Sequence, residues 1–147
     1  MVEACGEMPL YALTFLKAEE RARITAAPVA LKKGEMLFQR GEAAEGVFFL
    51  EKGKLAILQE TGFNERTQVV ALLDPGASVG EGGALGDSVR AATVIAVEDS
   101  LLYCFDRESL AALGEHDPQL LIRILRRLLY ASNVRLQKSS ERLALIL

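Results

Sequence analysis

Ten of the twelve glycines in this chain of 147 residues lie between Gly34 and Gly86. Short runs of aliphatic and aromatic residues alternate with these glycines and continue after them. Six of the runs have the composition of strands: 35–38, 46–50, 54–58, 68–73, 92–97 and 100–105. Short strands at roughly regular spacing, joined by turns that contain glycine, are typical of an antiparallel barrel or sandwich. The sequence therefore predicts a β-barrel over residues 31–105.

A helical pattern precedes the barrel. Apolar residues recur near helical spacing over residues 10–26, with charged residues on the other face. Pro28 marks the end of this pattern. We therefore predict an N-terminal helical segment over residues 1–30.

Downstream of the barrel the glycines nearly vanish, and two helices are predicted within residues 106–147. The first spans 107–113 and is closed by Gly114. The second has Pro118 in its first turn and runs to about Gln137 or beyond. The whole pattern predicts a mainly β fold with flanking helices. It is an antiparallel jelly-roll-like β-barrel with an N-terminal helix and a long C-terminal dimerisation helix.

The long helix carries two apolar stripes. The first stripe, six of whose eight members are apolar, is Ile122, Leu125, Leu129, Ser132, Leu136, Ser139, Leu143 and Ile146. The second is Leu121, Ile124, Leu128 and Ala131, and its spacing continues to Arg135. A helix that buries two faces must touch two bodies. We expect one stripe to pack on the barrel and the other on a second copy of the chain, giving a homodimer. The alternative is one wide face that folds onto a single core.

The charges are distributed unevenly along the chain. Seventeen Lys and Arg against twenty Asp and Glu give a net charge of −3. From Gln119 to the end there are six basic residues and one acid, a balance of +5, and the rest of the chain carries −8. The total excludes a chain that is basic throughout, and the terminal segment is too short to read DNA. We expect no direct nucleic-acid contact by this chain.

The chain has few residues that support metal or nucleophilic chemistry. It contains one histidine, His116, in a polar turn sequence, and two cysteines, Cys5 and Cys104. Zinc sites and metal-dependent barrel enzymes need a cluster of such ligands. We therefore expect no metal, no cofactor and no catalytic residues, so the protein is predicted not to be an enzyme. Few cysteines, the lack of a signal pattern and the lack of a membrane-spanning run predict a cytoplasmic protein without a membrane partner.

The segment 79–93 carries the polar chemistry of the barrel. Its clustered glycines allow several backbone N–H groups to point at one anion. Arg90 adds a permanent bidentate donor, and Glu81 is an acceptor for a hydroxyl group. A carboxylate beside an anion cradle suits a sugar phosphate, because its hydroxyl lies away from its charge. Two alternatives remain: the glycines only turn corners, or Glu81 is the ion-pair partner of Arg90.

This segment resembles the phosphate-binding cassette of the cyclic nucleotide-binding domain family, of the catabolite activator protein and protein kinase A regulatory subunit type. The family pattern is Phe-Gly-Glu-x-Ala-Leu with Arg-x-Ala nine residues after the Glu. Gly80-Glu81 and Arg90-Ala91-Ala92 match it with that spacing. Residues 31–35, Phe38, Gly41-Glu42, 47–50 and Gly53 resemble the family's first hairpins. The resemblance covers about residues 10–137.

The resemblance implies roles for individual residues. Arg90 would grip the cyclic phosphate, and Glu81 would accept a hydrogen bond from the ribose 2′-hydroxyl. Backbone N–H groups near Gly82, Gly83 and Ala91, beside the matched Gly80, would complete the phosphate cradle. Arg135, on the barrel-facing stripe, is a candidate contact for the purine, and its alternative is a surface cation on a basic helix.

Three positions depart from the family pattern, and a fourth bears on the choice of base. Val79 replaces the aromatic residue, Gly82 an apolar residue, and Val89 a frequent proline. Ala91 stands where members that prefer cyclic GMP often have Thr, which favours cyclic AMP. The predicted ligand is therefore cyclic AMP or cyclic GMP, with cyclic AMP favoured.

The predicted function is that of a cyclic-nucleotide-binding sensor domain. It would be the effector-binding part of a catabolite-activator-like transcriptional regulator, or a stand-alone regulatory subunit. Binding would pull the loop 82–89 inward and reset the C-terminal helix. The alternative is a degenerate module of the same fold that dimerises or docks without a ligand. Replacing Arg90 with Leu is expected to lower affinity with folding nearly intact.

Overall fold

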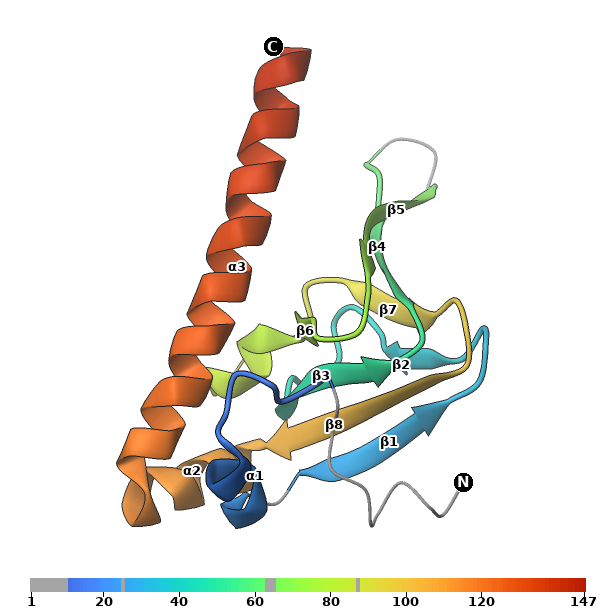
Figure 1. Ribbon diagram of the computed structural model, residues 1–147. Helices are drawn as coiled ribbons and strands as arrows, with labels where there is room; N and C mark the ends of the chain where they lie inside the picture. The colour runs from blue at the N-terminus through green and yellow to red at the C-terminus, as the bar shows by residue number, and fades with distance from the viewer. Residues whose placement is uncertain (1–10, 25, 63–65, 87) are drawn as a thin grey trace.

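The computed structural model describes residues 11–24, 26–62, 66–86 and 88–147. It contains two four-stranded antiparallel sheets, with the longest helix standing along one side of them (Figure 1). The strands of one sheet follow the order β1 (Ala27–Leu31), β8 (Ser100–Asp106), β3 (Gly46–Lys52) and β6 (Ser78–Val79). Those of the other follow β2 (Met36–Phe38), β7 (Thr93–Ala96), β4 (Leu55–Glu60) and β5 (Thr67–Leu73). This confirms the jelly-roll-like arrangement, although the two sheets do not close into a continuous barrel.

Within the described ranges, four helices accompany the sheets. They are α1 (Ala18–Arg23), the 3-10 helix η2 (Glu81–Ala84), α2 (Arg107–His116) and α3 (Pro118–Ile146). Both α1 and α2 lie near the N-terminal end of α3, whose other end extends past the sheets (Figure 1). Among the described residues, no helix is both long and apolar enough to cross a membrane.

The helix predicted over residues 10–26 is shorter in the structure. Within that range, residues 12–15 form a turn and the helix is confined to α1. Leu13 and Leu16 are buried in the turn, so their spacing reflects burial rather than a helix. The carboxylate of Glu51, buried on β3, accepts hydrogen bonds from the backbone N–H groups of Tyr11 (2.7 Å) and Ala12 (2.9 Å). These bonds fix the segment against the sheet without helical geometry.

Two further differences from the expectation have local causes. Pro28 lies inside β1 rather than ending a helix, which is possible because β1 is an edge strand and proline is tolerated there. Gly114 lies inside α2, which continues to His116. A Cβ at Gly114 would lie 3.3 Å from a methyl group of Leu121. The glycine therefore permits close packing of α2 on α3 and does not end the helix.

The sheet that contains β3 and β8 is covered on both faces. One face packs on the second sheet, through residues such as Leu50, Leu55 and Leu102. The other packs on the helices, with Phe49 and Phe105 at its centre and their rings edge to face at 5.7 Å. Burial on both faces explains why Val47–Leu50 is an uninterrupted apolar run rather than an alternating one.

The two stripes of α3 have different environments. Leu120, Ile124 and Leu128 are buried against the sheet and the N-terminal turn. The apolar members of the first stripe are all exposed: Ile122, Leu125, Leu129, Leu136, Leu143 and Ile146. Of these, Leu143 and Ile146 also line a groove between α3 and β5. The expectation that one stripe packs on the protein's own sheets is confirmed. The alternative, in which both stripes form one wide face buried in a single core, does not hold because the first stripe is exposed. The contact of the other stripe with a second copy stays a prediction.

The stripes predict a stability difference between two substitutions on α3. Ile124→Ala removes a side chain with no exposed surface. It should lower the free energy of unfolding by about 2–5 kcal/mol, through lost apolar burial and a cavity. Leu129→Ala, at 70% exposure, should change it by about 0.5 kcal/mol or less. Urea denaturation at a concentration where the chain is monomeric measures both, and an equal loss in the two variants would contradict this packing.

Candidate functional site

The segment 79–93 forms a compact loop at the end of β6. Gly80 follows the strand in the left-handed conformation, with φ +74°, and η2 comes directly after it. A Cβ at Gly80 would lie 2.5 Å from Nη1 of Arg90, and a Cβ at Gly83 would lie 1.9 Å from the carbonyl oxygen of Gly46. Glycine is therefore required at both positions. At Gly80 the left-handed backbone and the close contact both require it, and at Gly83 the close contact alone does.

The backbone N–H of Gly83 donates to the carbonyl of Gly80 at 2.9 Å and so closes the turn of η2. The other two predicted cradle positions, Gly82 and Ala91, line a cavity together with Gly80. Gly82 has room for a side chain, because the nearest atom to its Cβ position is Ser88 Oγ at 3.7 Å. The cradle residues thus lie together, with the Gly83 N–H already used in this structure.

Arg90 is buried, at 7% exposure. Its Nη1 donates to the carbonyl of Gly80 at 3.0 Å and its Nη2 to the carbonyl of Gly46 at 2.9 Å. The guanidinium carbon lies 4.2 Å from the centroid of the Phe38 ring, a cation–π distance. Its Nε is also buried and has no hydrogen-bond partner among the described residues. The side chain therefore holds the loop to β3 and still carries one unused donor.

The charge state of Arg90 follows from its surroundings. Burial lowers the pKa of its guanidinium, because the charged form loses solvation. The neighbours that raise the pKa again are Cys104, Glu42, Glu45 and Glu81. Arginine begins so far above neutrality that the group stays protonated in spite of burial. The cavity is therefore lined by a permanent positive charge.

Glu81 pairs with Arg135 rather than with Arg90. Its Oε1 lies 2.5 Å from Nη1 of Arg135 and accepts a hydrogen bond from Ser78 Oγ at 2.9 Å. Arg135 also donates through Nη2 to the backbone carbonyl of Ser78. The structure thus replaces the expected alternative, an Arg90–Glu81 ion pair, with one that links the loop to α3. Arg135 is not the isolated surface cation of the other alternative, since its side chain is only 29% exposed.

A cavity of about 170 Å³ collects these groups. It is lined by six of the seven predicted site residues: Gly80, Glu81, Gly82, Arg90, Ala91 and Arg135. Gly83 is the exception, because it is buried against Gly46. Two arginines and a carboxylate around a small cavity suit an anion that also carries a hydroxyl group.

Sequence reasoning missed Ser78 as a partner of Glu81, and it missed the two partners of Arg90 that lie outside the loop, Phe38 and Gly46. Phe38 was part of the hairpin match but had no assigned role. Ser78 stands three residues before Glu81 and offered a local signal, whereas the contact of Gly46 with Arg90 spans 44 residues. Among the described residues there is no group of three His, Cys, Asp or Glu side chains placed to hold a metal.

Comparison with known proteins agrees with this geometry. The family model described as the cyclic nucleotide-binding domain matches residues 28–117. Human cGMP-dependent protein kinase 2 is 35% identical over 78 residues, which cover 52% of this chain and 10% of the kinase. The cyclic AMP receptor protein of Thermus thermophilus is 34% identical over 82 residues, 55% of this chain and 37% of that protein. The chain therefore spans only a minor part of the length of these relatives.

Solved structures show the same architecture. The catabolite activator protein of Thermus thermophilus superposes with a TM-score of 0.72 at 28% identity, over 89% of this chain and 60% of that one. A cyclic nucleotide-binding domain from Methylobacillus flagellatus gives a TM-score of 0.83 at 21% identity, over 90% and 75% of the two chains, and supports the fold alone. The family model matches well over half of the residues of this chain, and the chain therefore belongs to the cyclic nucleotide-binding domain family.

Proposed function

We propose that this chain is a non-enzymatic sensor domain that binds a cyclic nucleotide, with cyclic AMP favoured over cyclic GMP. The observation that carries the proposal is the cavity that Arg90 and Glu81 both line, together with the buried Nε of Arg90, which has no hydrogen-bond partner among the described residues. An unpaired buried donor costs about 1–3 kcal/mol. A phosphate that reached Nε would relieve this cost, so the site favours an anion. Ala91 supports the preference for cyclic AMP, and relatives of both kinds exist.

The roles proposed for the site residues follow the cavity. Arg90 grips the cyclic phosphate, with the backbone around Gly82 and Ala91 beside it. Glu81 accepts a hydrogen bond from the ribose 2′-hydroxyl. Arg135, which lines the same cavity from α3, contacts the purine. Its bond to Glu81 supports a link between ligand and helix, because the ribose hydroxyl and Arg135 use the same carboxylate. Binding would then change the populations of two positions of α3. The size of that change is set by the difference between the ligand's affinities for the two positions.

A second candidate is a silent module of the same fold. It is favoured by the contacts that the site residues make with one another and with the backbone. Both terminal nitrogens of Arg90 are bonded to backbone carbonyls, and Glu81 is occupied by Arg135 and Ser78. A ligand must therefore exchange contacts rather than simply add them. The titrations described below separate the two candidates.

The larger context is also proposed. Similarity to a cyclic AMP receptor protein and a catabolite activator protein supports the effector-binding part of a transcriptional regulator. A stand-alone regulatory subunit is the alternative. In either case we propose a cytoplasmic location, supported by the free Cys104, and no direct contact of this chain with nucleic acid. Cys5 lies outside the described residues.

The Arg90→Leu variant tests the phosphate grip. Isothermal titration with cyclic AMP and cyclic GMP should show affinity lower by about ten- to a hundredfold, because charge-assisted hydrogen bonds are lost. The expectation of nearly intact folding needs correction. The substitution leaves the carbonyls of Gly80 and Gly46 without Arg90, at about 1–3 kcal/mol for each buried group. The titration is therefore run at a temperature where circular dichroism shows both proteins folded.

Arg40→Leu is the matched control for that titration, since it removes the same charge from an exposed site whose ion pair with Glu60 spans 4.0 Å. Its affinity should equal that of the wild type. Equal affinities in wild type and Arg90→Leu would contradict the grip. A wild type that binds neither nucleotide would favour the silent module.

The role of Glu81 is tested by comparing cyclic AMP with its 2′-deoxy analogue. The wild type should prefer the ribose form by about tenfold or more, the worth of a hydrogen bond to a charged group. In Glu81→Ala the ratio of the two affinities should fall to near one. The ratio is the measurement, because removing Glu81 also frees Arg135 and changes both affinities together. A preference that survives in Glu81→Ala would assign the hydroxyl to another acceptor.

The exposed stripe of α3 supports a homodimer, and Leu129→Glu tests it. A charge in an apolar helix seam should convert a dimer to a monomer in analytical ultracentrifugation, because the charge would be buried without a partner. Gln137→Glu adds the same charge at an exposed position outside both stripes and should leave the dimer intact. A wild type that sediments as a monomer at all concentrations would remove the dimer from the proposal.

A further inference from the structure

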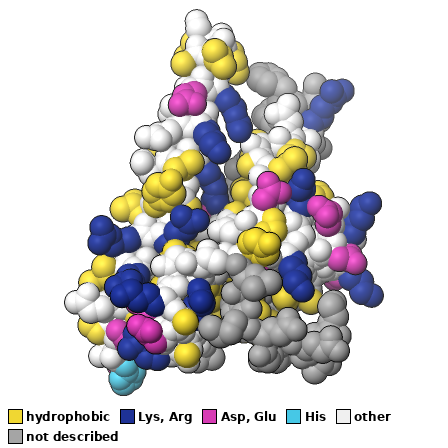
Figure 2. Space-filling model, viewed as in Figure 1, with side chains coloured by type: hydrophobic (Ala, Val, Ile, Leu, Met, Phe, Trp, Pro, Cys, Tyr) yellow, Lys and Arg dark blue, Asp and Glu magenta, His cyan; other side chains and the backbone are white. Residues whose placement is uncertain are grey.

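A groove of about 830 Å³ runs between α3 and the side of the protein formed by β5 and the turn after it. Its walls differ in chemistry. The β5 wall contributes apolar side chains such as Val70 and Leu72, and the α3 wall contributes Arg127, Arg135, Lys138 and Arg142. Figure 2 shows Lys and Arg side chains stacked along α3 on the side that faces the strands.

The charge of the groove is one-sided. Of the described residues that line it, four are cations and Asp74 is the one acid. Asp74 has its own partner outside the groove, the Lys54 amine at 3.8 Å. Between Pro118 and Ser140 the sequence of α3 contains no Asp or Glu. No acid one helical turn away therefore neutralises Arg127 or Arg135.

The four cations are not equally free. Arg127 lies over the rings of Phe15 and Tyr130, at 5.9 and 5.5 Å. Arg135 bonds to Glu81, and Arg142 donates to the backbone carbonyl of Val70 at 3.1 Å. Lys138 lies between Arg135 and Arg142 along the helix and has no ion pair or hydrogen bond among the described residues. The nearest acid along the helix is Glu141, three residues further on, and no ion pair joins it to Lys138 among the described residues.

The groove leads to the cavity that holds Arg90. Ile57 and Arg135 line both, so the two spaces meet at the Arg135 side chain. Residues before Gln119 carry a net charge of −8, which repels an anion from most of the surface. A groove lined by one sign of charge concentrates the field and raises the rate at which a ligand of opposite charge arrives.

We propose that this groove is the entry route of the anionic nucleotide, and that Lys138 with Arg142 steers it toward the cavity. The inference rests on the proposed function, because it needs a negatively charged ligand in the cavity. It assigns the two residues to the association rate and not to contacts of the bound state. Arg135 stands at the junction and must move aside for the ligand to pass.

The test measures association and dissociation rates of a fluorescent cyclic AMP by stopped flow. At about 0.02 M salt, Lys138→Glu should associate about three- to tenfold more slowly than the wild type, and the double variant with Arg142→Glu more slowly still. Dissociation rates should agree within about twofold. At about 0.5 M salt the association rates should converge, because the charges are screened beyond a few ångströms.

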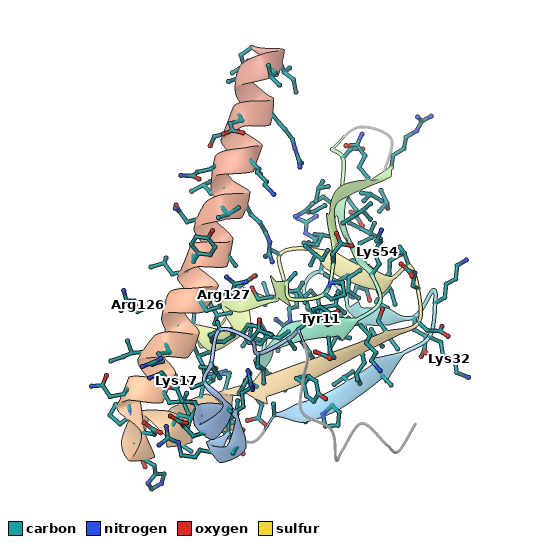
Figure 3. The ribbon with its side chains drawn as sticks, in the orientation of Figure 1. Tyr11, Lys17, Lys32, Lys54, Arg126 and Arg127 are labelled. Carbon is teal, nitrogen blue, oxygen red and sulfur yellow. The ribbon has the colours of Figure 1, made fainter. Side chains whose placement is uncertain are left out.

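Arg126→Glu is the control, with the same change in net charge. Its side chain points away from the strands, whereas Arg127 points toward them (Figure 3). It should lower the association rate by less than about twofold. Equal slowing of association by Arg126→Glu and Lys138→Glu would overturn the route and leave only an effect of net charge. A Lys138→Glu variant that binds more weakly only because it dissociates faster would also overturn the route. A wild type that binds no fluorescent nucleotide would overturn the proposed function and this inference together.

Discussion

The buried guanidinium of Arg90 is the contact on which the shape of the site depends. It joins the loop to β3 through the carbonyls of Gly80 and Gly46, and it stacks on Phe38. An arginine is buried at little net cost only where such contacts replace lost water. Gly80 follows from it, because a side chain there would collide with Arg90, whereas Gly83 is required by the backbone of Gly46 on β3. Close contacts in the loop, and not only the need for turns, therefore explain glycine at these two positions.

The ion pair between Glu81 and Arg135 extends this arrangement to α3. The helix is held near its start by packing of Leu120 and Ile124, and further along by a salt bridge to the loop. Packing is insensitive to a ligand, whereas the salt bridge uses a carboxylate that faces the cavity. Under the proposed function, the first part of α3 stays in place and the contact at Arg135 is the one that a bound ligand would change. The proposed conformational response would then lie in the C-terminal half of the helix.

Much of this structure could be predicted from local sequence. Apolar runs gave six strands, and the spacing of Glu81 and Arg90 located the loop, because each signal lies within a few residues. β1 was missed, since Pro28 suggested a break and only its edge position makes it compatible with a strand. The helix over 10–26 was predicted too long, since Leu13 and Leu16 are buried in a turn fixed by Glu51. The partner of Glu81 was 54 residues away, and no local pattern specifies such a pair.

The balance between a sensor and a silent module depends on which polar groups of the site have no partner within the described part of the chain. Contacts of Arg90 with two carbonyls, and of Glu81 with Arg135, are exchanged on binding and contribute little net free energy each. The Nε of Arg90 differs, because it has no hydrogen-bond partner among the described residues. A hydrogen bond from Nε to a phosphate would therefore break no existing bond. Lys138 and Arg142 are assigned to the association rate and not to the bound state, so they do not enter this exchange. The Nε of Arg90 is therefore the group that would gain from a phosphate without giving up a partner, and it is the physical reason to propose the sensor ahead of the silent module.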